Sequence, residues 1–134
     1  MNFDIDIQVY LKYPLNNGFE ISEYKNYGMS EYCKLEYQIL SLEIWRDRID
    51  YYSSIIFNNN NYNTIHLANF LNDKISKYEF IDFSFETINV DSERFLTLLN
   101  QIIESEFDNI LNFLFNITDE KYNDFIEYCE KSSM

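Results

Sequence analysis

An α+β fold is predicted for this chain, in which a small antiparallel sheet from the N-terminal half and one central strand packs against a helical C-terminal half. Apolar and polar residues alternate near the N-terminus, as they do along a half-buried strand, whereas apolar residues recur at helical spacing beyond residue 91. The chain has 2 Gly and 1 Pro among 134 residues. This scarcity favours helices with polar connections over a fold made of many tight turns.

The N-terminal half is predicted to supply most of the strands. Perfect alternation predicts a strand over residues 3–11, and a second short strand at 19–21 follows a turn-forming Asn-Asn-Gly sequence. Between residues 33 and 45 the spacing of apolar residues fits both a strand and a helix. We expect a strand at 34–40 and then a helix at 41–57. The residues expected on one face of the first strand are Phe3, Ile5, Ile7, Val9 and Leu11.

The remaining elements are predicted mainly from capping residues and apolar stripes. In order, they are an exposed loop at 58–61, a helix at 64–77 capped by Asn63, a strand at 80–86, a helix starting at Asp91 and Ser92, a helix at 107–116, and a last helix starting at Thr118. No internal repeat or interdomain linker is apparent. We therefore expect residues 1–134 to form a single acidic domain.

The strong acidity of the chain bears directly on its partners. A formal net charge of -13 repels phosphate backbones, so direct binding of nucleic acid is not expected. A basic protein, in contrast, would be attracted over a distance. No stretch approaches the length of a membrane span and no secretion signal is visible, which predicts a cytoplasmic protein. Cys33 and Cys129 are expected to remain reduced packing residues.

No recognisable catalytic or cofactor motif is present. His66 is the only histidine, which excludes a metal site built on several histidines, and we expect it to be structural. Asp4 and Asp6 would share a strand face, where a solvated surface explains them better than a catalytic pair. The glycine-rich loops that bind nucleotide phosphates are absent. We therefore predict no cofactor and no metal.

Charge placement is the one functional signal in the sequence. No basic residue lies between Lys77 and Arg94, or between Arg94 and Lys121, whereas acidic residues and phenylalanines occur in both stretches. Aromatic anchors surrounded by charged residues are common in protein interfaces. The predicted partner-binding residues are Asp82, Glu86, Glu104, Glu106, Phe107, Asp108 and Phe113.

These observations favour a protein-binding inhibitor over an enzyme. In size, acidity and lack of a catalytic motif, the chain resembles bacterial toxin-immunity proteins, which suggests that it neutralises a basic toxin such as a nuclease. One alternative is a phage or viral protein that mimics nucleic acid and blocks a host enzyme. Another is an enzyme that uses scattered carboxylates.

Overall fold

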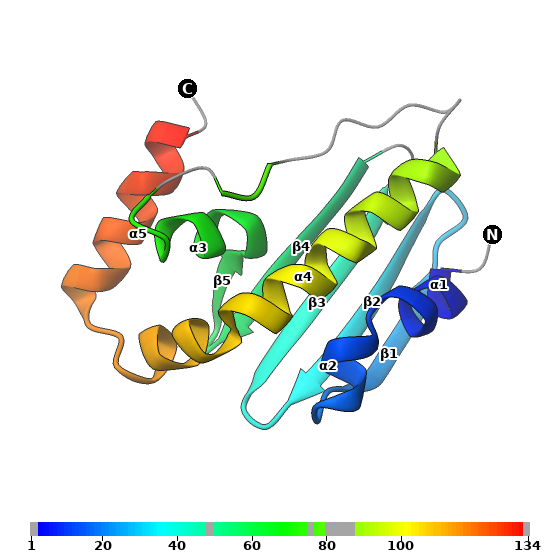
Figure 1. Ribbon diagram of the computed structural model, residues 1–134, viewed down its shortest axis with the longest axis horizontal. Coiled ribbons are helices and arrows are strands. Elements are labelled where there is room, and N and C mark those ends of the chain that lie inside the picture. The colour runs from blue at the N-terminus through cyan, green and yellow to red at the C-terminus, as the bar shows by residue number, and fades with distance from the viewer. Residues whose placement is uncertain (1–2, 48–49, 75–76, 80–87, 133–134) are drawn as a thin grey trace.

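The computed structural model describes residues 3–47, 50–74, 77–79 and 88–132, with side chains from residue 92 onward in the last range (Figure 1). The elements are α1 (Phe3–Tyr10), α2 (Lys12–Asn16), β1 (Glu20–Asn26), β2 (Ser30–Tyr37), β3 (Leu40–Asp47), β4 (Asp50–Phe57), β5 (Asn60–Asn63), α3 (Thr64–Phe70), α4 (Ile88–Phe115) and α5 (Asp119–Ser132). The five strands form one antiparallel sheet in sequence order. The predicted α+β class, with an N-terminal sheet against C-terminal helices, is confirmed. The central strand predicted at 80–86 lies outside the described residues.

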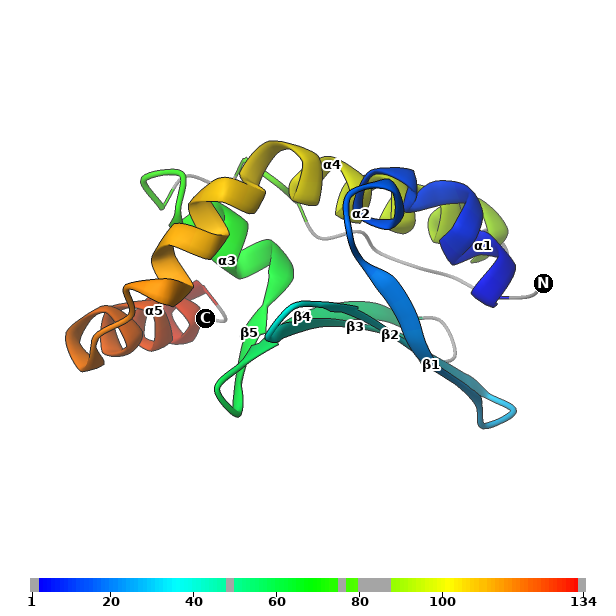
Figure 2. The same cartoon turned by 90° about the horizontal axis from the view of Figure 1, so that it is seen from below.

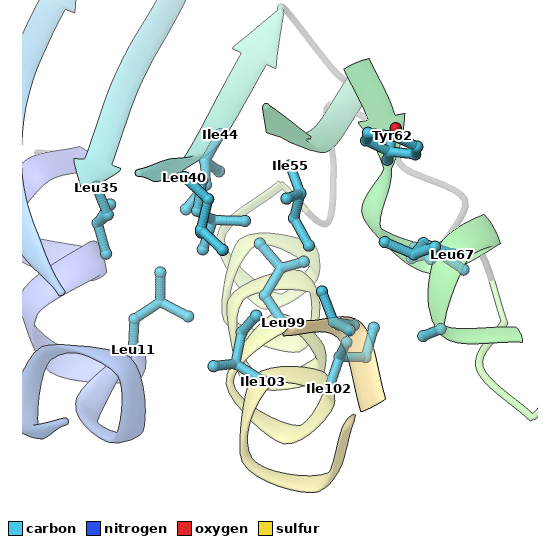
Figure 3. Close-up of a cluster of buried hydrophobic side chains, with 14 of the residues drawn as sticks. Leu11, Leu35, Leu40, Ile44, Ile55, Tyr62, Leu67, Leu99, Ile102 and Ile103 are labelled. Atoms are coloured by element: carbon cyan, nitrogen blue, oxygen red, sulfur yellow. The ribbon is translucent and has the colours of Figure 1, made fainter. Parts of the chain in front are cut away.

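All the helices that pack on the sheet lie on the same side of it. Figure 2 shows α1, α2 and α4 above the sheet, with α3 and α5 beyond β5 at one end. Alternate residues of β2, β3 and β4 point toward these helices and are buried, as in Leu42 and Ile44 of β3. In Figure 3, Leu99 and Ile103 of α4 face Ile44 of the sheet. Packing of α4 against the sheet therefore forms the centre of the core.

The prediction of a strand over residues 3–11 is wrong, because this segment forms α1 and the turn that follows it. Phe3, Ile7 and Leu11 are spaced four residues apart, so a helix also places them on one side, and all three are fully buried. Ile5 and Val9 then face outward and are 51% and 45% exposed. Packing of the helical stripe outweighed the strand preference of the alternating pattern.

The helix predicted at 41–57 is also wrong, because these residues form the hairpin of β3 and β4. The strand predicted at 34–40 instead begins at Ser30 and ends at Tyr37, and a turn with Gln38 at positive φ separates β2 from β3. The short strand predicted at 19–21 is part of the longer β1. The strands therefore extend over much more of this half than predicted.

The predicted loop at 58–61 is confirmed only in its first half. Asn58 and Asn59 both have positive φ, which asparagine tolerates well, and they form the turn between β4 and β5. The other two asparagines, Asn60 and Asn61, begin β5. The polar tract is therefore a hairpin turn followed by a short edge strand.

The helices after β5 agree better with prediction. The side chain of Asn63 accepts a hydrogen bond of 3.0 Å from the backbone N–H of His66, so the predicted cap of α3 is confirmed. This helix ends at Phe70 rather than at residue 77, and Asp73 and Lys74 beyond it have positive φ, which a continuing α-helix does not allow. The side-chain amide of Asn69 pairs with both backbone groups of Tyr78. The hydroxyl of Thr118 accepts a hydrogen bond from the N–H of Lys121, which confirms the start of α5.

The helices predicted from 91 and at 107–116 are one continuous helix, α4. Its described buried residues run through the expected boundary without interruption: Ser92, Phe95, Leu96, Leu99, Ile102, Ile103, Glu106, Ile110, Phe113 and Leu114. Glu106 is polar but buried, so the helical stripe continues across the acidic stretch. None of the helices in the described residues combines the length and the apolarity needed to cross a membrane.

Candidate protein-binding surface

The predicted partner-binding residues divide between the surface and the core. Glu104 and Asp108 are exposed and lie one turn apart on the solvent side of α4. Phe113 is buried, and Phe107 is partly buried against Phe19 and Tyr37, with ring centroids 5.4 and 5.0 Å away. Asp82 and Glu86 lie outside the described residues. The predicted set therefore does not form one surface within the part of the chain that the structure describes.

Glu106 lies in the core and not on the surface, because its side chain is 3% exposed and points into the protein. Its carboxylate accepts hydrogen bonds from Asn72 (2.8 Å), Tyr78 (3.0 Å) and Lys77 (3.3 Å). Burial alone would raise the pKa of Glu106, but these hydrogen bonds outweigh it and hold the pKa below its ordinary value. Glu106 thus connects α4 to the segment that follows α3 and is not available to a partner.

The sheet has a second face that none of the described elements covers, and we call it the open face (Figure 2). It carries the side chains that alternate with the buried ones, such as Lys34 on β2, Trp45 on β3 and Tyr52 on β4. A protein sheet can leave one face to solvent when that face is polar. Here the face is only partly polar, because large aromatic side chains gather on it.

Four aromatic side chains, Tyr27, Tyr32, Trp45 and Tyr52, form what we call the aromatic row of the open face. Tyr32 and Trp45 are direct neighbours across β2 and β3, and Trp45 and Tyr52 are neighbours across β3 and β4. The Trp45 ring lies 4.6 Å from Tyr32, 6.1 Å from Tyr52 and 6.2 Å from Tyr27, measured between centroids. Its plane is within 12° of Tyr27 and 15° of Tyr52. The row is thus continuous from the β1–β2 turn to β4.

The row is accessible at both ends. Tyr27 is 57% exposed and Tyr52 is 44% exposed, and Met29 in the β1–β2 turn is 63% exposed. Tyr32 is buried beneath its neighbours although none of the described helices covers it. Exposed aromatic surface of this kind is more typical of a binding face than of an ordinary solvated sheet.

Carboxylates flank the aromatic row on both sides. Sheet register places Asp47 opposite Asp50 on one side, and Glu43 opposite Lys34 on the other. The described acidic residues of the open face are Glu20, Glu23, Glu36, Glu43, Asp47 and Asp50. Its lysines are already paired, since Lys25 lies 2.7 Å from Glu23 and Lys34 lies 3.3 Å from Glu36. The open face therefore carries an aromatic row near the Asp47–Asp50 end of its strands, with net negative charge on both sides of the row.

Burial and charge raise the pKa of two tyrosines of the row, Tyr32 and Tyr52. Burial raises the pKa of Tyr32 strongly, and the neighbouring Glu43 carboxylate raises it further. Burial and the nearby Asp47 raise the pKa of Tyr52 as well. Both side chains consequently present neutral rings and hydroxyl groups at physiological pH.

The helix-covered face fixes the strands that carry this row. Glu31 and Arg46 are opposite each other on β2 and β3 and form an ion pair in which Glu31 is buried and Arg46 is partly buried. The Glu31 carboxylate also accepts hydrogen bonds from the Phe3 N–H (3.2 Å) and the Tyr24 hydroxyl (2.6 Å). A buried carboxylate with this many partners holds its neighbours in place, because losing any one leaves desolvated charge. The pair therefore ties α1, β1, β2 and β3 together directly behind the aromatic row.

A small pocket of about 150 Å³ lies apart from the open face and is lined by Lys74, Asp124, Glu127, Tyr128 and Lys131. It is smaller than the cavities of about 300 Å³ or more that usually hold small ligands. The contact with Lys131 lowers the pKa of Glu127, whereas a catalytic acid needs a raised pKa. Among the residues that the structure describes, no three His, Cys, Asp or Glu side chains come together as a metal site requires.

Sequence reasoning did not identify the open face, because Trp45 and Tyr52 both lie in the helix that it expected at 41–57. In the hairpin they are cross-strand neighbours, which a pattern within one segment does not reveal. A usable signal was the high share of aromatic and β-branched residues at 51–57, five of the seven, which is typical of a strand. Comparisons with protein-family models, with curated proteins and with solved structures find no match to this chain.

Proposed function

We propose that this protein is a cytoplasmic, immunity-type inhibitor that binds a basic protein, such as a nuclease toxin, through an acidic surface. One observation carries the proposal: the open face combines accessible aromatic side chains with flanking carboxylates in a protein of net charge -13. Aromatic residues supply the apolar contact of an interface, and charge of one sign selects a partner of the other.

The inhibitory mechanism follows from what a nuclease needs. A nuclease binds phosphates through a positively charged surface, and a rigid surface bearing carboxylates competes for the same side chains. Long-range attraction accelerates the encounter, and this acceleration decreases as salt screens the charges. The exposed Glu104 and Asp108 on α4 add to this field even where they make no contact. Inhibition is thus expected to be stoichiometric and its onset sensitive to salt.

Affinity capture from the source cell, followed by assays with the purified partner, tests the proposal. The expected partner is basic, loses its activity at one equivalent of this protein, and associates more slowly as NaCl rises from about 50 to 500 mM. A partner encoded beside this gene as a toxin supports immunity, whereas a host enzyme supports nucleic-acid mimicry. A neutral or acidic partner, or a bound partner whose activity is unchanged, would contradict the proposal.

A further inference from the structure

The chemistry of the open face is more specific than negative charge alone. Its aromatic row, Tyr27, Tyr32, Trp45 and Tyr52, crosses strands that the Glu31–Arg46 ion pair fixes from behind. Carboxylates lie at the neighbouring register positions on both sides of the row. We propose that the aromatic row is an arginine-binding site, which receives arginine side chains from the basic partner. This inference rests on the proposed function and adds the recognition chemistry to it.

The ring geometry suits a planar cation. Tyr27, Trp45 and Tyr52 have nearly the same ring orientation, within 12° and 15° of each other in successive pairs. A guanidinium group stacks on aromatic faces through both its charge and its flat shape, and tryptophan attracts cations most strongly. Trp45 lies at the centre of the row, so a group stacked there also reaches its neighbours.

The carboxylates complete the site. A guanidinium group that lies on a ring directs its N–H groups outward in its own plane, where they need acceptors. Glu43 lies next to Trp45 on one side along the sheet, and Asp47 and Asp50 lie on the other. A lysine ammonium group has three N–H donors on a compact charge but no flat face, so it cannot stack on a ring and direct its donors to carboxylates in the plane of that contact. The surface therefore favours arginine over lysine.

Two other occupants fit the face less well. Single-stranded nucleic acid also stacks on aromatic side chains of open sheets, but it requires a positive groove for its phosphates. A second copy of the chain would bring the same carboxylates face to face, as Asp47 and Asp50 already are within one molecule. Charge complementarity thus selects a cationic partner over both.

The sequence provides a built-in probe, because Trp45 is the only tryptophan. We suggest titrating the protein with capped hexa-arginine and, separately, capped hexa-lysine peptides while recording tryptophan emission at about 50 mM NaCl. Hexa-arginine should change the emission and bind about two- to fivefold more tightly than hexa-lysine, as one added cation–π contact at an exposed site predicts. Equal binding of the two peptides, or unchanged emission, would overturn the proposal. A single-stranded oligonucleotide that binds as well, or self-association through this face, would also overturn it.

Two double variants of equal charge separate the site from the general field. Asp47→Asn with Asp50→Asn removes two carboxylates beside the row, and Glu104→Gln with Asp108→Asn removes two exposed carboxylates from α4. The first variant should weaken hexa-arginine binding at least about threefold more than the second. Equal losses would show that only net charge matters. Because Asp47 and Asp50 face each other, neutralising them should not harm folding, and thermal unfolding checks this.

A third variant, Tyr52→Ser, removes one exposed ring and leaves every charge in place. It should reduce the preference for arginine over lysine while hexa-lysine binding stays the same. The natural partner then distinguishes the two proposals. If a basic partner is bound and inhibited equally by the wild type, Tyr52→Ser and the Asp47/Asp50 variant, the arginine site is refuted and the inhibitor function stands. If no basic partner is inhibited, the function itself fails, whatever the peptides do.

Discussion

Glu106 shows that a carboxylate within an acidic stretch can belong to the core. Its neighbours Glu104 and Asp108 are exposed, but the helix turns Glu106 to the opposite side, where Asn72, Lys77 and Tyr78 donate hydrogen bonds to it. Hydrogen bonds to a charged group contribute more than those between neutral groups, and an unpaired buried donor is costly. Glu106 is therefore expected to affect stability and not binding.

Replacing Glu106 by Gln should lower the free energy of unfolding by about 1–3 kcal/mol at pH 7, because the charge-assisted hydrogen bonds are lost. The folded-state pKa of Glu106 lies below its ordinary value of 4.5. Its contribution is consequently complete above that value and disappears as the pH falls through the folded-state pKa. Urea unfolding at pH 7, 5 and 3.5 should show the difference between wild type and variant shrinking toward acid.

Glu104→Gln is the matched control, because it makes the same chemical change two residues away on the exposed side of α4. Its effect should stay within about 0.5 kcal/mol at each pH. Equal destabilisation by the two variants would contradict the assignment of Glu106 to the core.

At the scale of elements, apolar spacing and capping residues predicted the C-terminal helices well, but the outward-facing aromatics misled the prediction of the hairpin. Trp45 and Tyr52 are apolar on the solvent side of β3 and β4, which hides the alternation expected of a half-exposed strand. The pattern of apolar residues within one segment cannot distinguish an exposed aromatic face from a buried stripe, because both consist of apolar residues. The aromatic residues most relevant to the candidate site are therefore the same ones that made β3 and β4 difficult to predict as strands.

The first element is a different case, because both helix and strand place Phe3 and Ile7 on one side. The exposure of Val9 distinguishes the two structures. In α1, Ile7 is fully buried, whereas Val9 is 45% exposed. A strand would have buried both on one face. The surroundings of α1, including the Phe3 N–H bound to Glu31, decide the outcome, and these contacts are distant in sequence.

Two substitutions to alanine test whether this segment is a helix. Ile7→Ala should destabilise the protein by about 2–5 kcal/mol, because it leaves a cavity in the core. Val9→Ala should have almost no effect or stabilise slightly, since Val9 is exposed and alanine is the better helix former. Chemical denaturation of both variants measures the difference. Similar large losses for both would indicate that the two side chains share a buried strand face.

For the whole molecule, the sequence correctly indicated an acidic surface in a helix-covered α+β fold, whereas the position of the candidate site required the three-dimensional pairing of strands. The acidic C-terminal stretch was predicted as the binding site because its acidic residues lie close together in the sequence. On the open face the carboxylates come from separate strands, as Glu43 does on β3 and Asp50 on β4. Sheet register, which sequence spacing did not reveal, brings them beside the aromatic row.

The same charge distribution predicts an unusual dependence of stability on salt. Like charges repel in the folded state, and Asp47 directly opposite Asp50 is one such pair. Exposed ion pairs such as Lys25–Glu23 and Lys131–Glu127 each contribute little to stability. Salt that screens these attractions therefore destabilises the protein less than screening of the repulsion stabilises it. With 23 acidic residues against 10 basic ones, repulsion should dominate.

Raising NaCl from about 10 to 150 mM shortens the screening length from about 30 to 8 Å, and the midpoint of thermal unfolding should rise as a result. Each 1 kcal/mol gained corresponds to about 4 °C for a domain near this size. The Asp47→Asn, Asp50→Asn variant should unfold at a higher temperature than wild type at low salt, and this difference should shrink as salt is added. Sodium sulfate and NaCl at equal ionic strength separate screening from salting-out, since only screening is common to both. A midpoint that falls as NaCl rises would show that attractive ion pairs dominate. The carboxylates of the surface would then be paired with the protein's own lysines and arginines and would not be available to those of a partner.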